Sequence, residues 1–147
     1  YHMNDGVTGN YWDYPMGSSA TPDNGNPGGD TGNSANFYDG DYTIDSPYYR
    51  TPGGYFSLSD SPYGTFDQGG NVREWTESLA YAGIGWRVLR GGSFGYDDVE
   101  LRAVSRNIDT PTDEYSLIVF RVSAIPEPAS IALLALAGVV GLGRERR

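Results

Sequence analysis

Residues 69–74, of sequence GGNVRE, combine two glycines with one carboxylate. Paired glycines favour a tight turn, and a tight turn leaves backbone carbonyl oxygens free of helix or sheet partners. Hard cations such as Ca²⁺ bind carbonyl oxygens of this kind together with a carboxylate. The segment therefore predicts one of two roles for Glu74. It is either the charged ligand of a calcium site or the partner of an arginine in a structural ion pair.

The residue types limit other chemistry. The chain contains no cysteine and a single histidine, His2. Thiolate metal sites and cysteine nucleophiles are therefore excluded from its own residues. Asp97, Asp98 and Glu100 could form a pair of acid–base carboxylates, although neighbouring acids in a loop are more often a solvated surface. Four arginines are expected to pair with carboxylates and to be structural: Arg90, Arg102, Arg106 and Arg121.

Charge and composition narrow the choice of partners. The formal net charge is −9 and the chain has no lysine. Because nucleic-acid binding requires a basic surface, we expect no nucleic-acid partner. An acidic surface suits a soluble extracellular protein and can also attract divalent cations. Aromatic residues make up 14 % of the chain beside 21 glycines, a composition that indicates a loop-rich fold with bulky side chains in its core.

Little regular secondary structure is expected around these residues. Trp86–Arg90 and Leu117–Val122 are the strongest strand candidates, and the second is a continuous apolar run of the kind found in a buried strand. Residues 36–67 alternate aromatic residues with turn formers, which favours short extended pieces. Ser18–Ser34 has almost no apolar side chain. It predicts a long surface loop that is held to the core by the aromatic residues on either side.

The C-terminal segment differs in composition from the rest of the chain. It begins with Pro126-Glu127-Pro128, continues with the uncharged run Ala129–Gly143 and ends in three arginines. As a helix the run would rise about 22 Å, which is less than a hydrocarbon core of about 30 Å. Basic residues directly after an apolar run stay on the cytoplasmic side of a membrane. The three parts in this order resemble the PEP-CTERM sorting signal of Gram-negative bacteria.

That resemblance implies an exported protein that is recognised by an exosortase-type sorting enzyme. Before processing, its C-terminal segment would lie in the membrane, and the protein would then reach the cell envelope or outer surface. Extracellular polysaccharide is a candidate partner there. An exported protein needs an export signal, and the sequence starts at Tyr1, so we expect a further N-terminal part. The predicted division is a domain at 1–123 followed by the sorting segment at 124–147.

The domain carries a second resemblance in three segments. They are residues 63–75, ending in GNVREW; residues 87–94, RVLRGGSF; and residues 101–107, LRAVSRN, with VFRV at 119–122. In this order and at this spacing they resemble the C-terminal half of the formylglycine-generating enzyme family, also called sulfatase-modifying factors. Arg73 stands where the family usually has Trp, and Val119 where it has Gly. The resemblance implies an α+β fold with little regular secondary structure, related to C-type-lectin-like domains, with a C-terminal hydrophobic helix after it.

The family's chemistry is where the sequence departs from the resemblance. Family enzymes oxidise a sulfatase cysteine to formylglycine with two cysteines that bind copper(I), a soft metal that prefers thiolates. The first of the two follows shortly after Gly-Gly-Ser, about where this chain has Tyr96. We therefore expect no copper. The iron centre of related sulfoxide synthases needs several histidines and is not expected either.

The resemblance also assigns binding residues. A first calcium site would use the carbonyls of Gly69, Gly70 and Val72 and the carboxylate of Glu74. A second would use Asn36 and the carbonyls of Phe37 and Phe56, with Gly54 in place of the family's acidic ligand and Asp39 or Asp41 as nearby charge. The family's pocket would be lined by Trp75, Ser93 and Asn107. Trp75 is then a stacking platform in a ligand cleft, or else it belongs to the core and Ser93 closes a turn.

Two functions from different classes follow. The first is a surface-sorted binding or structural module without catalysis. The second is an oxidoreductase or other enzyme of the same family that is active through an unrecognised site. A fold alone does not fix a function. Because the chain lacks the thiolates of the family's copper site, the first function is favoured.

Overall fold

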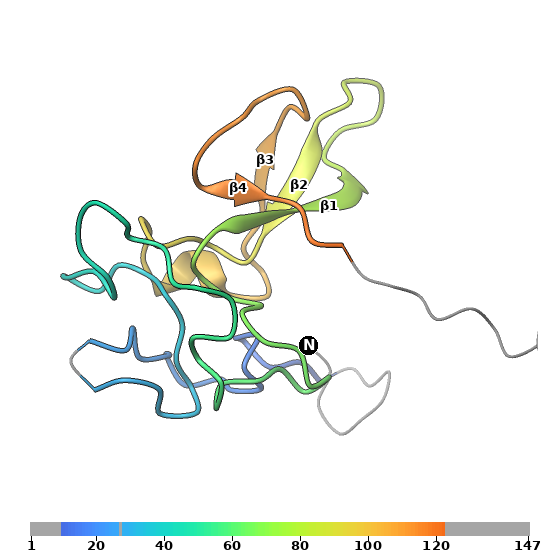
Figure 1. Cartoon of the computed structure of the whole chain (residues 1–147). Helices are drawn as coiled ribbons and strands as arrows, with labels where there is room; N and C mark the ends of the chain where they lie inside the picture. The colour runs from blue at the N-terminus through green and yellow to red at the C-terminus, as the bar shows by residue number, and fades with distance from the viewer. Residues whose placement is uncertain (1–9, 27, 123–147) are drawn as a thin grey trace, which may run out of the picture.

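The structure, a computed structural model, describes residues 10–26 and 28–122. His2 and the sorting segment with its expected helix lie outside them. Within these ranges most of the chain is loop (Figure 1), and no helix is long and apolar enough to cross a bilayer. The regular elements are β1 (Arg73–Leu79), β2 (Arg87–Arg90), the 3-10 helix η1 (Asp98–Leu101), β3 (Asn107–Asp109) and β4 (Ile118–Val119). The expected scarcity of regular structure is thus confirmed.

The four strands form one sheet in the order β3-β2-β1-β4. β2 is antiparallel to both β1 and β3, whereas β4 is parallel to β1. Trp75 of β1 lies opposite Leu89 of β2, and Leu89 lies opposite Asn107 of β3. Directly opposed residues of neighbouring strands share a face, so this row places Trp75 and Asn107 on the same face with the buried Leu89 between them.

β1 divides two charged residues between the two faces of the sheet. Successive side chains of a strand point to opposite faces, so Arg73 and Trp75 share one face and Glu74 lies on the other. The contacts agree with this alternation, because Arg73 bonds Glu100 of η1 whereas Glu74 bonds Arg121. We call the two sides the Arg73 face and the Glu74 face.

A small core holds η1 against the turn that follows β2. Tyr14, Ala35, Phe37 and Leu101 form one buried cluster, and the Tyr14 hydroxyl donates to Asp98 Oδ2 at 2.5 Å. Gly92 has a φ of +67°, and a Cβ there would lie 2.9 Å from the Leu101 side chain. Only glycine meets both conditions without strain, which explains why the Gly-Gly-Ser turn can pack directly on η1.

Asn71 joins the N-terminal loops to the start of β1. Its N–H donates to the Asn36 carbonyl at 2.7 Å, and its side-chain oxygen accepts from the Thr51 N–H at 3.1 Å. Its amide nitrogen donates to the Thr51 carbonyl at 3.0 Å. The preceding Gly70 cannot carry a side chain, since a Cβ there would lie 2.3 Å from the Asn36 carbonyl oxygen. Packing therefore requires glycine at position 70, and the hydrogen bonds to Thr51 favour asparagine at position 71.

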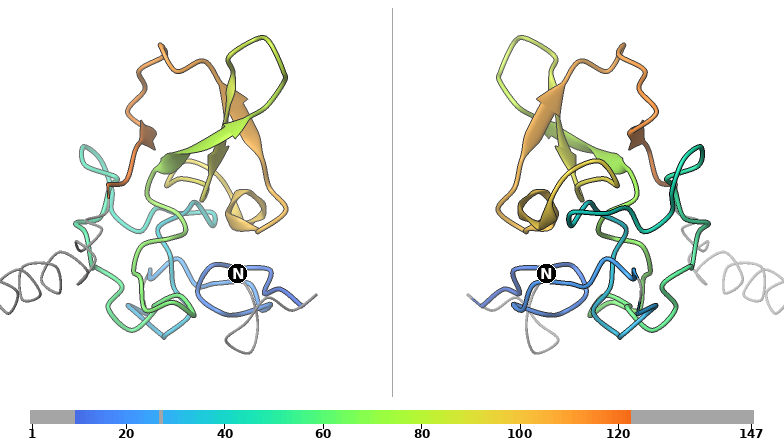
Figure 2. Two further views of the ribbon diagram at one scale, coloured as in Figure 1. Left: turned by 90° about the vertical axis from the view of Figure 1, so that its right-hand side faces the viewer. Right: turned by 90° about the vertical axis from the view of Figure 1, so that its left-hand side faces the viewer.

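The N-terminal loops lie at the opposite end of the described structure from the sheet (Figure 1, Figure 2). The described part of Ser18–Ser34 contains no helix or named strand, which confirms the predicted loop. Asp30 links it to residues 58–59 by accepting from the Ser59 hydroxyl at 2.6 Å and the Leu58 N–H at 2.5 Å. Burial raises the pKa of Asp30, but these hydrogen bonds outweigh it and leave the pKa below its ordinary value.

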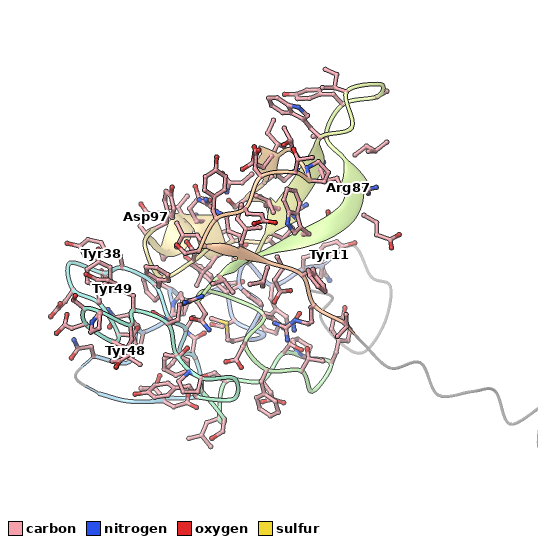
Figure 3. All side chains as sticks on the ribbon, turned by 45° about the horizontal axis from the view of Figure 1, so that its top comes forward. Tyr11, Tyr38, Tyr48, Tyr49, Arg87 and Asp97 are labelled. Carbon is pink, nitrogen blue, oxygen red and sulfur yellow. The ribbon has the colours of Figure 1, made fainter. Side chains whose placement is uncertain are left out.

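Aromatic rings connect these loops to the Gly-Gly-Ser turn. Tyr38 contacts Tyr42, Tyr42 contacts Tyr49, and Tyr49 stacks on Phe94 with ring centroids 5.6 Å apart. Figure 3 shows Tyr38 and Tyr49 together on one side of the molecule, well away from Arg87 on β2. Offset or edge contacts of this kind stabilise beyond the area they bury, so aromatic packing replaces regular structure in this region.

One strand prediction is confirmed and the other is wrong. Trp86–Arg90 corresponds to β2, which begins one residue later. Leu117–Val122 was expected as a buried strand, but only Ile118 and Val119 pair, and Phe120 and Val122 are 74 % and 81 % exposed. Their apolar run follows the edge of the sheet and leaves it after two residues, so hydrophobicity overstated both the length and the burial of the strand.

Candidate functional site

Arg73 is a nearly buried cation at the start of β1. Its side chain is 11 % exposed, and its Nη2 lies 3.4 Å from Glu100 Oε2. Its guanidinium carbon lies 4.0 Å from the centroid of the Tyr96 ring, a cation–π distance. The Nε atom is buried and has no hydrogen-bond partner in the described part of the chain. A guanidinium carries five N–H donors, so one long bond leaves most of its capacity unused.

Glu100 gathers several donors on the Arg73 face. Its Oε2 accepts from Arg73, from the Ser105 hydroxyl at 3.4 Å and from the Asn107 side-chain amide. η1 positions this carboxylate because Leu101 is fixed in the core next to it. Asn107, predicted to line a ligand pocket, therefore has its amide nitrogen occupied by Glu100.

A cavity of about 280 Å³ opens beside Arg73. Its wall includes the guanidinium, the Tyr96 and Tyr115 side chains and one carboxylate, Asp109. Tyr115 belongs to the connection between β3 and β4, drawn in orange in Figure 1, which arches beside the sheet. Tyr96 and Tyr115 are 42 % and 58 % exposed, so both rings are accessible to a ligand. We call this cavity the Arg73 pocket.

A second cavity of about 470 Å³ lies next to it and is lined by Trp75. It shares Tyr115 and Ile118 with the Arg73 pocket. We call it the Trp75 pocket. The third residue of the predicted cleft, Ser93, lines neither cavity. It is fully buried in the turn after β2, and its hydroxyl has no hydrogen-bond partner among the described residues.

The Glu74 face holds the predicted first calcium residues. Glu74 Oε1 accepts from Arg121 Nε at 2.9 Å, and Arg121 also donates to the carbonyls of Phe66 and Asp67 at 3.0 and 2.7 Å. A cavity of about 230 Å³ here is lined by Gly70, Val72 and Glu74, three of the four predicted ligands, together with Asp67 and Arg121. The structure thus contains the ion pair that was the alternative to calcium.

The fourth predicted ligand and the second calcium set have other surroundings. Gly69 is buried against the Pro15 side chain. The Asn36 amide donates to the Tyr49 carbonyl at 2.9 Å, while its side-chain oxygen is buried without a partner in the described residues. The Phe56 carbonyl accepts from an N–H at 3.3 Å. No group of three His, Cys, Asp or Glu side chains that could hold a metal occurs within 10–26 and 28–122, so both calcium sites stay predictions based on backbone oxygens.

Comparison with protein families decides what the domain is. Residues 7–124 match the sulfatase-modifying factor enzyme 1-like domain. The chain belongs to this family. Among solved structures it is similar to PvdO from Pseudomonas aeruginosa, with 23 % identity and a TM-score of 0.44; the match covers 58 % of this chain and 37 % of PvdO. Among curated proteins, none matches the sequence.

Membership of the sulfatase-modifying factor family makes two substitutions informative. By the motif resemblance, Arg73 lies at the position of the usual Trp, and Tyr96 lies about where the first copper-binding cysteine would be expected. The structure brings these two residues into direct contact across the Arg73 pocket. The donor set does not fit copper(I), because the pocket offers a phenol and a guanidinium and no thiolate of the kind that this soft metal prefers, and the sequence contains no cysteine.

Sequence reasoning missed several residues of the site. Arg73 and Tyr96 both depart from the pattern that the resemblance implies, and this shared status was the signal in the sequence for their contact. Asp67 has no motif signal in the sequence, yet its Oδ2 accepts from the Gly54 N–H at 2.5 Å. A carboxylate thus does lie beside Gly54, and it comes from Asp67. Tyr115 had no signal beyond being an aromatic residue in a polar loop.

Proposed function

We propose that this member of the sulfatase-modifying factor family is a non-catalytic binding module that acts at the cell surface. The observation that carries the proposal is the contact of Arg73 with Tyr96, where the family has a tryptophan and a copper thiolate. Where the resemblance places the family's redox site, this chain offers a cation, an aromatic ring and an accessible cavity. Groups of these types commonly orient a ligand in a pocket.

The physical case rests on what each group can do. A tyrosine phenol and a guanidinium are both poor ligands for copper(I). Both are frequent in binding pockets, where a few placed polar groups orient a ligand against aromatic walls. The Arg73 pocket has this composition.

A direct assay separates a module from an enzyme. The full chain, incubated with copper(I), oxygen and a sulfatase peptide that carries its target cysteine, is expected to form no formylglycine. Mass spectrometry of the peptide measures the aldehyde, and a cysteine-containing family enzyme serves as the positive control. Aldehyde formation above the protein-free background would restore the oxidoreductase alternative.

The surface location is supported by the three-part C-terminal segment. A Pro-Glu-Pro entry, an uncharged run and a basic end together suit recognition by a sorting enzyme, while the run alone would suit a plain anchor. An exosortase-type enzyme and the membrane would then be transient partners, and the outer surface the destination.

Two variants separate sorting from anchoring in a host that has an exosortase. Deleting Pro126–Arg147 is expected to release the protein into the medium. Replacing Pro126, Glu127 and Pro128 by alanine keeps the apolar run and the arginines, and is expected to leave unprocessed protein in the membrane. Immunoblots of medium, membrane and surface fractions measure both. Normal surface delivery of the alanine variant would rule out motif-dependent sorting.

A further inference from the structure

We propose that the Arg73 pocket binds the carboxylate of an acidic sugar, a uronate unit of an oligosaccharide. The proposal rests on the proposed binding function and adds the chemical class of the ligand. It starts from a feature that a folded domain does not need for stability, which is a nearly buried guanidinium with spare donors beside an open cavity.

The unused donors of Arg73 select an anion. Buried donors without acceptors destabilise a protein, and within the described residues Glu100 is the only hydrogen-bond acceptor of this guanidinium, at 3.4 Å. The ring of Tyr96 restricts the orientation of the guanidinium plane. Because Nε is buried below the surface, the edge left for a ligand is that of Nη1 and Nη2, and two parallel hydrogen bonds from such an edge match a carboxylate.

The charges around the pocket limit that anion to a single negative charge. Glu100 already offsets part of the charge of Arg73, and Asp109 places a second carboxylate in the wall. The net charge of the chain is −9. A dianionic phosphate would meet repulsion that one shared guanidinium cannot offset, whereas a carboxylate brings one charge.

The other walls select a hydroxyl-rich ring. Asp109 Oδ1 accepts the Thr110 N–H at 2.9 Å, and its other carboxylate oxygen has no partner in the described ranges, so it can accept from a ligand hydroxyl. Tyr96 and Tyr115 present aromatic surface to the C–H groups of a sugar ring, and both carry a hydroxyl. A volume of about 280 Å³ lies at the small end of ligand pockets and suits a single ring.

The Trp75 pocket gives the sugar chain a second position. It shares Tyr115 with the Arg73 pocket and is lined by Trp75 and Phe120, with two acids, Asp113 and Glu114. It contains no cation. A neighbouring sugar unit could stack on Trp75 and donate its hydroxyls to the acids, so the two cavities together suit an oligosaccharide with its uronate in the Arg73 pocket.

Isothermal titration calorimetry on the full chain in mild detergent tests the ligand class. The probes are glucuronosyl-maltose, which is maltotriose with its non-reducing end oxidised to a single uronate, together with its methyl ester, maltotriose and acetate. The acid is expected to bind, and the ester and maltotriose to bind at least about tenfold more weakly, because they cannot form a charge-assisted pair with Arg73. Acetate is expected to bind far more weakly than the acid, since it lacks the ring.

Three variants locate the site. Arg73→Lys keeps the charge but loses the planar fork, and is expected to weaken binding of the acid by on the order of tenfold. Tyr115→Ala removes an exposed ring and should weaken the acid and maltotriose alike. Arg106→Lys is the matched control, since Arg106 is exposed and precedes β3. Circular dichroism establishes that each variant is folded.

Each outcome decides the proposal. Loss of binding in the ester and in Arg73→Lys, with Arg106→Lys unchanged, supports it. No binding of the acid, equal binding of acid and ester, or an acetate affinity equal to that of the acid overturns it. If Arg73→Lys does not fold, the ester and Tyr115→Ala decide. A failure here without aldehyde formation overturns only the acidic-sugar assignment and leaves the non-catalytic module in place.

Discussion

Two neighbouring charged residues of β1, Arg73 and Glu74, lie on opposite faces of the sheet and differ in how fully they are paired. On the Glu74 face, Arg121 donates a hydrogen bond to the Glu74 carboxylate, and the same guanidinium also donates to two backbone carbonyls. On the Arg73 face, the cation has one long bond to Glu100 and a buried Nε without a partner in the described residues. Each face borders a cavity, but the charged groups of the Glu74 face are paired with each other, whereas Arg73 retains a donor without a protein partner in the described residues. The difference distinguishes a structural ion pair from a proposed binding site at the next residue of the strand.

Glu100→Gln is the change expected to alter the Arg73 face most. It removes the only counter-charge of Arg73 within the described structure and weakens the acceptor for Ser105 and Asn107. Because the Glu100 side chain is 26 % exposed, we expect a loss of about 2 kcal/mol in the free energy of unfolding, below the cost of breaking a fully buried pair. Urea denaturation measures it, with the exposed Glu77→Gln of β1 as the control.

The same variant has an effect that a purely structural role would not produce. Without Glu100 as a competing anion, Arg73 should bind glucuronosyl-maltose several-fold more tightly. Calorimetry without urea, at a temperature where the variant is folded, measures this gain in affinity. If the variant loses stability and also binds the acid more weakly, Glu100 is needed to position Arg73. The Arg73 face would then hold a structural ion pair, as the Glu74 face does.

Much of this arrangement could be predicted from local sequence, and the decisive part could not. Turn formers and interspersed aromatic residues indicate a loop-rich domain, and β2 is evident from its apolar residues. β1 reads REWTESL, which has too few apolar residues to stand out, and its burial depends on strands and loops from distant parts of the chain. β3 has only three residues. Neither length nor composition identifies such elements.

The site shows the same limit in a sharper form. The motifs fixed where Arg73 and Tyr96 depart from the family, but their contact depends on how η1 and the Gly-Gly-Ser turn pack, which is set by Gly92 and Leu101. The Arg121 partner of a carboxylate was anticipated as a type of contact. The identity of that carboxylate required the register of β4 beside β1, which turn and strand signals do not contain.

The smallest expected effect concerns Glu74 and tests whether its carboxylate is only the partner of Arg121 in a structural ion pair. Glu74→Gln preserves size but removes the charge that Arg121 meets. Arg121 and Glu74 are 44 % and 21 % exposed at their side chains, so solvent screens the pair. The free energy of unfolding without calcium is therefore expected to fall by about 1 kcal/mol. The melting temperature of the native protein should then respond little to calcium. Thermal melts of both proteins, with chelator and with excess calcium, measure these effects, and Glu77→Gln is again the control.

A calcium site would give the opposite result in the thermal melts, and binding theory gives the expected gain in stability. Binding to the folded state alone stabilises it by RT ln(1 + [Ca²⁺]/Kd), about 2.7 kcal/mol at a hundredfold excess over Kd. Calcium would have to draw the Glu74 carboxylate from Arg121 toward the carbonyls of Gly70 and Val72. The native protein would then gain stability with calcium, and Glu74→Gln would lose most of that gain while its calcium-free form stayed near native stability. That result would show that the Glu74 face binds calcium, and that Arg121 pairs with the Glu74 carboxylate only in the calcium-free protein.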